Sequence, residues 1–310
     1  MTTLKKYLSL VKFSHTIFAL PFALIGFFLG LKYSYATNNA SYTLHQLQNK
    51  IAGYSNNEMI AAYGKILILV ILCMVFARSA AMAFNRWLDA KFDAKNPRTA
   101  VREIPAGIIK SGNALLFVII NCLLFIAATF FINSLCFFLS PVALFVVLFY
   151  SYTKRFTALC HLVLGVGLSL APIGAYIAVT NQFAILPILF SFSVLFWVSG
   201  FDIIYALQDE AFDKENQLHS IPVALGKVKA LRLSELLHVL SASLVLFAGY
   251  YGSFGLWYWI GAGLFAALLL YQHLLVKPND LSKVNMAFFT TNGIASVVFA
   301  VFVLLDIFIN

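Results

Sequence analysis

The sequence predicts an all-α integral membrane protein with nine transmembrane helices. Apolar residues make up 62% of the chain and charged residues 11%, whereas soluble domains average about 45–50% and about 25%. The apolar residues fall in runs of about 20, the length of a helix that crosses the hydrocarbon core of a bilayer. Lysines and arginines gather in the segments between alternate runs, as the topology rule for membrane proteins requires.

Nine runs are long and apolar enough to cross the membrane. The first, Phe13 to Leu31, follows three lysines as a signal peptide would. It exceeds the usual apolar core of about 7–15 residues, so we expect it to be retained as a helix. In order, the expected spans are 14–31, 61–84, 114–132, 135–150, 158–179, 184–206, 231–250, 254–275 and 286–309. Together they make residues 1–310 a single membrane domain.

The distribution of positive charge predicts the orientation. Placing the N-terminus on the inner, cytoplasmic side of a bacterial inner membrane also places inside the segments 85–113, 151–157, 207–230 and 276–285. Only three of the 21 lysines and arginines then lie outside: Lys32, Lys50 and Lys65. A wrong number of spans would destroy this asymmetry, because every later loop would change sides.

Composition and spacing argue against several other functions. The net charge is +9, but no basic stripe or recognition motif accompanies it, so we expect no nucleic-acid partner. The four cysteines lack CxxC spacing and no histidines form HExxH, so we expect buried hydrophobic cysteines and no zinc site. The 32–60 segment is a polar outer loop to which we assign no chemistry. We expect contact with membrane lipid and infer no obligate protein partner.

Acidic residues are concentrated in two inner segments. Eight of the twelve acids lie there: Asp89, Asp93, Glu103, Asp202, Asp209, Glu210, Asp213 and Glu215. Carboxylates contribute little to topology, so the positive-inside rule does not explain this clustering. We expect the acids to bind something positively charged.

The first acidic cluster has the pattern NxxxDxxxD, formed by Asn85, Asp89 and Asp93. On a helix, residues four apart share one face and lie about 6 Å apart along the axis. The three side chains would therefore project oxygens in one line. Magnesium prefers hard oxygen ligands and often binds one or two carboxylates together with substrate phosphates and water. The spacing thus predicts a magnesium site.

The second cluster repeats the first at a constant offset of 120 residues. Asp89, Phe92, Asp93 and Asn96 correspond to Asp209, Phe212, Asp213 and Asn216, with Asp202 one further turn before the second cluster. A single DxxxD pattern is often only a solvated helix end that pairs with nearby lysines. Two copies on the same side favour two similar half-sites at the inner face of the bundle.

Two facing carboxylate arrays are typical of a site that holds a diphosphate through bridging magnesium ions. Breaking an allylic C–O bond leaves pyrophosphate and a carbocation. Some of the 31 phenylalanines could line a tunnel for an isoprenoid chain and stabilise the cation with their π faces. Most of them must be ordinary packing or lipid-facing residues.

Three motifs resemble those of the UbiA superfamily of intramembrane prenyltransferases. They are Asn85 to Asp93, Gly200-Phe-Asp202-Ile-Ile-Tyr205 to Asp213, and Tyr150…Lys154-Arg155-Phe156-Thr157. The likeness covers roughly residues 10–305 and includes Ser220-Ile-Pro-Val-Ala-Leu-Gly226. It implies nine helices around a central cavity, with an active site capped by the inner loops 85–113 and 207–230.

The resemblance also implies roles for individual residues. Catalysis would depend on Asp89, Asp93, Asp202, Asp209 and Asp213. One magnesium ion would be held by Asn85, Asp89 and Asp93, and the other by Asp209 and Asp213. The diphosphate would contact Arg102 and Lys154, and the acceptor would lie near Arg155 and Asp202, with Tyr205 as a further substrate-binding residue. The substrates would be a polyprenyl diphosphate and an aromatic acid, most often 4-hydroxybenzoate, in ubiquinone-type quinone biosynthesis.

Two departures from the hydroxybenzoate branch leave the acceptor open. The first span begins Phe13-Ser-His-Thr-Ile, where that branch tends to have an Arg-Pro-rich start. After the first motif the chain reads Val101-Arg-Glu-Ile-Pro-Ala-Gly107, where that branch usually reads Asn-Arg-Pro-Leu-Pro-Ser-Gly. Both features resemble a UbiA-like subgroup, some members of which are associated with menaquinone synthesis by the futalosine route. There the acceptor would be 1,4-dihydroxy-6-naphthoate.

Other functions are compatible with parts of the pattern. Within the same superfamily, the acceptor could be haem, chlorophyllide or a lipid alcohol. A secondary transporter also uses intramembrane acids, but along an ion path. Here the acids lie at inner helix ends and repeat at metal-binding spacing, which favours the enzyme. A non-catalytic scaffold would give no reason for the carboxylates to cluster.

Overall fold

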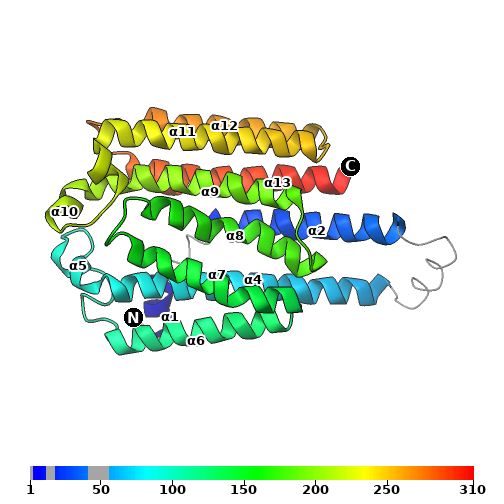
Figure 1. Ribbon diagram of the computed structural model, residues 1–310, viewed down its shortest axis with the longest axis horizontal. Coiled ribbons are helices and arrows are strands. Elements are labelled where there is room, and N and C mark those ends of the chain that lie inside the picture. The colour runs from blue at the N-terminus through cyan, green and yellow to red at the C-terminus, as the bar shows by residue number, and fades with distance from the viewer. Residues whose placement is uncertain (1–2, 12–17, 41–55) are drawn as a thin grey trace.

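The computed structural model describes residues 3–11, 18–40 and 56–310, and the side chains of 5–11, 18–34 and 61–310. The chain forms a bundle of long helices that run side by side (Figure 1). Within the described residues, eight helices are long and apolar enough to cross a membrane, and Leu20–Ser34 is a shorter apolar helix. The expected all-α membrane bundle is therefore confirmed. The first residues of the expected span 14–31 lie outside the described residues.

Nine long helices lie in the part of the chain that the structure describes. They are α2 (Leu20–Ala40), α4 (Asn56–Leu88), α6 (Ser111–Phe130), α7 (Ser134–Thr153), α8 (Cys160–Thr180), α9 (Ile185–Ala206), α11 (Ile221–Tyr251), α12 (Leu256–Leu275) and α13 (Asn292–Ile309). Shorter elements are α1 (Thr3–Leu10), α5 (Ala90–Lys95), the 3-10 turn η2 (Leu207–Asp209), α10 (Glu210–Glu215) and the π-helix η3 (Met286–Thr291). The short helices α5 and α10 lie together at one end of the bundle, which we call the aspartate end (Figure 1).

Two expected boundaries were wrong. The outer segment 32–60 is partly helical, because α2 continues to Ala40 and α4 begins at Asn56. The inner segment 207–230 is also partly helical, since α11 begins at Ile221 rather than 231. This early start includes a break at Gly226, whose φ of 73° is a conformation that favours glycine. Three basic residues, Lys227, Lys229 and Arg232, hide this part of α11 from a search for apolar runs.

Helix α8 lies between two groups of helices. It packs against α2 and α9 on one side and against α7 on the other. The first group closes through the neighbouring pairs α9–α11, α11–α12, α12–α13 and α13–α2. The second group consists of α4, α6 and α7, which contact one another. Residues on the α4, α7, α8 and α9 surfaces between the groups are therefore available to line a cavity.

Aromatic side chains fill the core of the larger group. Trp197, Phe22, Phe265 and Phe299 are fully buried. Their ring centroids lie 5.2–6.4 Å apart in the contacting pairs, the range of favourable tilted and edge-to-face packing. Many of the 31 phenylalanines are thus packing residues, as expected.

Small residues allow helices α8 and α9 to approach closely. A Cβ atom on Gly165 would lie 2.4 Å from Ser199 Oγ and 2.5 Å from the carbonyl oxygen of Leu195. Gly174, on the same helix, has nothing within 4 Å of such an atom. Close backbone packing of this kind is a common source of helix association in membranes.

We expect Gly165→Ala to lower the melting temperature of the detergent-purified protein, because overpacking against a backbone atom costs about 1–3 kcal/mol. The matched variant Gly174→Ala should be neutral or slightly stabilising, since alanine is the better helix former by up to about 1 kcal/mol. Thermal unfolding of both variants checks this. Equal melting temperatures for the two would contradict the proposed α8–α9 contact.

Candidate active site

A large polar cavity opens at the aspartate end of the bundle. It has a volume of about 1050 Å³ and lies among α4, α8, α9, η3 and the turn between α7 and α8. All ten site residues expected from the sequence line it: Asn85, Asp89, Asp93, Arg102, Lys154, Arg155, Asp202, Tyr205, Asp209 and Asp213. The three motifs, which are far apart in the sequence, therefore meet around one space.

The two aspartate motifs have the same local structure. The six-residue helix α5 begins just after Asp89, and the six-residue helix α10 begins just after Asp209. The backbone angles φ and ψ are −91° and 5° at Asp89 and −101° and 1° at Asp209. Each short helix contains the second aspartate of its motif, Asp93 or Asp213, and that residue is buried. The repeat at an offset of 120 residues is thus a repeat of structure.

This local structure corrects one expectation. Asn85, Asp89 and Asp93 do not lie on one continuous helix, because α4 ends at Leu88 and α5 begins at Ala90. Backbone hydrogen bonds still join Asp89 to Asn85 (2.9 Å) and Asp93 to Asp89 (2.8 Å). The helical spacing is retained across the break, so all three side chains still line the cavity.

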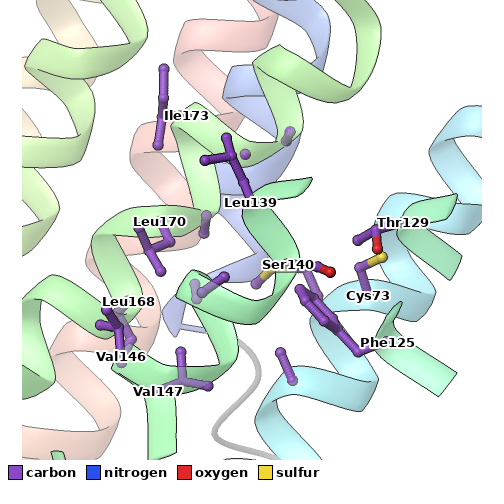
Figure 2. Close-up of a pocket in the computed structure, with 18 of the residues that line it drawn as sticks. Cys73, Phe125, Thr129, Leu139, Ser140, Val146, Val147, Leu168, Leu170 and Ile173 are labelled. Atoms are coloured by element: carbon purple, nitrogen blue, oxygen red, sulfur yellow. The ribbon is translucent and has the colours of Figure 1, made fainter. Parts of the chain in front are cut away.

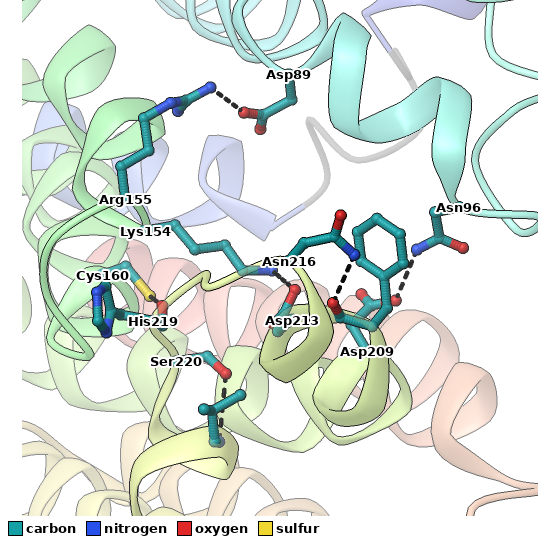
Figure 3. A network of polar contacts seen from close by, with 12 residues as sticks. Asp89, Asn96, Lys154, Arg155, Cys160, Asp209, Asp213, Asn216, His219 and Ser220 are labelled. Carbon is teal, nitrogen blue, oxygen red and sulfur yellow. Dashed lines mark hydrogen bonds and ion pairs between the residues drawn. The ribbon is translucent and has the colours of Figure 1, made fainter.

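In the first motif, both aspartates are paired with arginines from other segments. Arg155 Nη2 lies 2.8 Å from Asp89 Oδ1 (Figure 3). Arg102 Nη1 contacts both oxygens of Asp93, at 2.7 and 2.9 Å. The side-chain amide of Asn85 donates a hydrogen bond to Asp89 Oδ2 at 3.2 Å, and the side-chain oxygen of Asn85 takes no part in this bond.

In the second motif, the partners come from the first motif's loop and from the turn after α7. Arg98 contacts Asp209 through Nε (3.2 Å) and Nη2 (2.5 Å), and Asn96 also donates to Asp209 at 3.5 Å. Lys154 Nζ lies 2.8 Å from Asp213 Oδ1 (Figure 3). Since Lys154 and Arg155 are adjacent, one turn contacts both motifs and joins the two half-sites.

Burial and pairing act in opposite directions on these charges. Burial raises the pKa of Asp89, and the neighbouring Arg155 offsets only part of that effect. For Lys154, burial favours the neutral amine, but the Asp213 carboxylate outweighs it and the pKa of Lys154 is raised. The cavity therefore holds carboxylates that need a positive partner to remain ionised.

Arg98 was missed by the sequence analysis. It pairs with Asp209, and its Nη1 donates to the hydroxyl of Tyr205 at 2.9 Å. Its guanidinium also lies over the Tyr205 ring, 5.4 Å from the centroid. The loop after the first motif contains several basic residues, and sequence spacing could not show which of them reaches the second motif.

His161 was also missed, although it contacts an expected residue. Its Nδ1 lies 2.7 Å from Asp202 Oδ2, and both residues line the cavity. The backbone amide of Ile221 donates to His161 Nε2 at 3.3 Å, so the ring proton lies on Nδ1 and is donated to Asp202. A histidine at the edge of an apolar run gave no sign of this pairing.

Two further arginines on α4, Arg78 and Arg86, line the cavity. The Nε atoms of both and Nη1 of Arg86 are buried, with no hydrogen-bond partner in the described part of the chain. Arg78 lies 11 residues before Asp89, about 16 Å deeper along the helix. An ionisable residue inside a predicted span is itself a signal of a functional site, and this signal could have identified Arg78.

Beyond Arg78 the cavity adjoins an apolar pocket of about 350 Å³ (Figure 2). Arg78, Met82, Tyr150, Leu164 and Leu168 line both spaces. The labelled side chains of the pocket are mostly apolar, apart from Cys73, Thr129 and Ser140, and come from α4, α6, α7 and α8 (Figure 2). The site as a whole therefore has a charged end and an apolar end.

Comparison with known proteins identifies the family. A model of the UbiA prenyltransferase family matches residues 52–294. The chain belongs to the UbiA prenyltransferase family. The expected resemblance is confirmed, and with it the assignment of the chain as a prenyltransferase.

Its relatives and structural neighbours agree with this family. The 4-hydroxybenzoate octaprenyltransferase of Nitrosomonas europaea is 32% identical over 236 residues, which cover 76% of this chain and 80% of the relative. That of Tolumonas auensis is 30% identical, covering 76% and 82%. The apo structure of a UbiA homologue from Aeropyrum pernix K1 superposes with a TM-score of 0.73 at 26% identity, covering 95% and 97%. A UbiA homologue from Archaeoglobus fulgidus bound to DMAPP and Mg²⁺ has the same fold, with a TM-score of 0.69 at 20% identity, covering 98% and 100%.

The donor atoms of this UbiA site fit magnesium. Carboxylate and amide oxygens are hard ligands, and both motifs present them to one cavity. In the described residues, no three histidine, cysteine, aspartate or glutamate side chains are grouped so that they could bind a metal ion alone. Magnesium usually takes only one or two carboxylates and completes its shell with water and substrate phosphates, and each motif supplies two aspartates to the cavity.

We expect Asp89→Asn and Asp209→Asn each to abolish prenyl transfer while leaving the melting temperature within a few degrees of the wild type. Each change keeps the side-chain shape but removes the negative charge. Product formation and thermal unfolding of the purified variants check this.

Glu210→Gln provides the matched control. Glu210 is adjacent to Asp209, but it pairs with Lys227 and does not line the cavity. Its replacement should leave activity within about two-fold, since exposed ion pairs contribute little. Normal activity in either aspartate variant would refute the magnesium-binding role expected of that aspartate.

Proposed function

We propose that this enzyme transfers a polyprenyl group from polyprenyl diphosphate to an aromatic acid, in a magnesium-dependent reaction of quinone biosynthesis. The observation that carries the proposal is the meeting of four aspartates and four basic side chains around one cavity, which leads into an apolar pocket. A diphosphate with a long apolar tail matches that arrangement. The two 4-hydroxybenzoate octaprenyltransferases described above support the same reaction class, and the ligands of the Archaeoglobus fulgidus homologue, DMAPP and Mg²⁺, match the proposed donor and metal.

The proposed magnesium ligands are Asn85, Asp89 and Asp93 in one half-site and Asp209 and Asp213 in the other. When bound, magnesium would neutralise the diphosphate and stabilise it as a leaving group. Arg102 and Lys154 would contact phosphate oxygens. Arg98 and Arg155, which pair with Asp209 and Asp89, add two further cations beside the aspartate motifs. The segments between α4 and α6 and between α9 and α11 would then cap the active site.

The donor's isoprenoid chain would extend from the charged end past Met82, Leu164 and Leu168 into the apolar pocket. Burying each CH₂ group there contributes about 0.8 kcal/mol. The protein thus binds the tail by apolar contact and the diphosphate by charge.

Arg78 is the residue best placed to bind the acceptor's carboxylate. Of the two α4 arginines that line the cavity, Arg78 lies deeper than Arg86, and its Nε has no partner among the described residues. An arginine in apolar surroundings binds a carboxylate strongly through charge-assisted hydrogen bonds. Asp202, held by His161 Nδ1, would accept the proton that the aromatic ring loses after attack. Arg155, which pairs with Asp89 in the turn after α7, would also lie near the acceptor.

Two acceptors fit these features, and 4-hydroxybenzoate is the first candidate because the curated relatives carry that name. The second is 1,4-dihydroxy-6-naphthoate, on the evidence of the altered segments Phe13–Phe22 and Val101–Gly107. Membership of the family argues against the secondary transporter. The distribution of lysines and arginines supports a multi-pass protein of the bacterial inner membrane, with its N-terminus and aspartate end in the cytoplasm.

Product analysis tests the proposal directly. The detergent-purified protein would be given magnesium, a polyprenyl diphosphate and each aromatic acid separately, and the products followed by mass spectrometry. A prenylated hydroxybenzoate supports ubiquinone-type synthesis. A prenylated naphthalenediol with carbon dioxide released supports menaquinone synthesis. No prenylated product from either acid would contradict an aromatic-acid acceptor.

We expect Arg78→Leu to raise the KM for the aromatic acid about 10- to 100-fold, because a hydrogen bond to a charged group contributes about 1.5–3 kcal/mol. The KM for polyprenyl diphosphate should change by less than about two-fold. Steady-state kinetics with the acid and its methyl ester check the cause. The wild type should prefer the acid strongly and the variant should not. Equal preference in both proteins would remove Arg78 from the acceptor site.

A further inference from the structure

The last membrane span begins with an uncommon element, the π-helix η3 (Met286–Thr291). π-helices occur mostly as single turns at functional sites. Five of six consecutive residues here line the cavity: Asn285, Met286, Phe288, Phe289 and Thr290. The π-helix therefore forms one wall of the cavity.

Asn292, the first residue of α13, holds this turn in place. Its Oδ1 accepts hydrogen bonds from Trp197 Nε1 of α9 (2.8 Å) and Gln272 Nε2 of α12 (2.7 Å). Its Nδ2 donates to the carbonyl oxygens of Ala287 (3.2 Å) and Phe288 (2.8 Å) in the π-turn. Asn292 is fully buried. An unpaired polar group at such a site costs several kcal/mol, so the four bonds fix the turn against two neighbouring helices.

The turn places Phe288 against Tyr205. Their ring centroids are 4.2 Å apart with an interplanar angle of 31°, and Phe201 meets Phe288 edge-on at 5.4 Å. Tyr205 lies four residues before Asp209, one helical turn below the second aspartate motif. Phe288 and Tyr205 thus form an aromatic wall directly on the membrane side of the diphosphate-binding charges. The hydroxyl of Tyr205 accepts a hydrogen bond from Arg98 Nη1.

We propose that this Phe288–Tyr205 wall shields the allylic C1 atom of the prenyl donor from water, and that Asn292 is the positioning residue that holds it. The inference rests on the proposed prenyl transfer. The C1–O bond breaks and its electron pair leaves with pyrophosphate. C1 then forms a C–C bond to the acceptor ring, or a C–O bond to water, which releases a proton to solvent and gives polyprenol. The two rings exclude water without supplying a competing nucleophile. The Tyr205 ring already has the Arg98 guanidinium over it, so stabilisation of the cation would come from Phe288.

The test measures how the cation is partitioned between the two nucleophiles. Full-length wild type, Asn292→Leu and Phe288→Leu would be purified in detergent and given geranylgeranyl diphosphate, magnesium and the acceptor that the wild type uses. Prenylated acceptor, geranylgeraniol and pyrophosphate would be quantified together. We expect both variants to raise the ratio of geranylgeraniol to prenylated acceptor at least five-fold.

Ser241→Ala is the matched control for loss of a buried hydrogen bond. Ser241 is fully buried and pairs with Ser193 across α9 and α11 (2.9 and 3.0 Å), and neither residue lines the cavity. This control should keep the wild-type ratio even if its melting temperature falls. A control ratio that rises as much as in Asn292→Leu would reveal general loosening and overturn the inference.

The remaining outcomes are distinguishable. If the wild type prenylates no acceptor, the proposed function fails. If it prenylates an acceptor but Asn292→Leu and Phe288→Leu keep its alcohol ratio, the shielding inference alone fails. If Asn292→Leu does not fold, Phe288→Leu decides the question, because it changes no buried polar group. A raised alcohol ratio in that variant supports the inference, and an unchanged ratio overturns it.

Discussion

The structure of the site depends on the pairing of each motif aspartate with a basic side chain from a different segment. Moving a carboxylate out of water costs several kcal/mol unless a partner compensates it. Asp89 and Asp93 take theirs from Arg155 and Arg102, and Asp213 takes Lys154. These pairs draw the loops and the turn after α7 around one cavity. The same cations match the negative charge of a diphosphate, so the interactions that assemble the site are also those that would bind the substrate.

The internal repeat explains why the site has two sides. Asp89 and Asp209 each stand at a break between a long helix and a six-residue helix, with nearly identical backbone angles. The break turns the following helix so that its aspartate is buried beside the cavity. Arg98 and Asn96 extend from the first half to Asp209 in the second. An ion pair and a hydrogen bond thus connect the two half-sites, so a substitution in one half-site should also affect the other.

On the membrane side of the ion pairs, the two half-sites differ. In the proposed function, this difference would keep the prenyl donor and the aromatic acceptor in different places. The α4 side carries Arg78 and leads to the apolar pocket, whereas the α9 side carries Tyr205 and Asp202. A cation at depth suits an anionic acceptor, and an aromatic wall suits a reactive carbocation. The asymmetry lies in residues that are not part of the repeat. In the proposed function, the symmetric motifs would position the diphosphate, and residues outside the repeat would determine what reacts with it.

Sequence periodicity predicted the helices and the aspartates because both follow from local spacing. Long apolar runs predict membrane spans, and a spacing of four residues predicts that two side chains lie on the same face of a helix. The same reasoning missed Arg98, since several bases in its loop are equivalent in sequence. It also missed Asn292, whose four partners lie on three different elements. Such contacts depend on tertiary packing, and no local pattern encodes them. Arg78 is the exception, because a charge within an apolar run is visible in the sequence.

If the two aspartate motifs hold one diphosphate together, as proposed, pyrophosphate binding should need both of them. Calorimetric titration of pyrophosphate in the presence of magnesium, with wild type, Asp93→Asn, Asp213→Asn and the double variant, measures this requirement. Each single variant should lose nearly as much binding free energy as the double variant, because the ligand needs both halves. Losses that add independently, or one motif that proves dispensable, would contradict it.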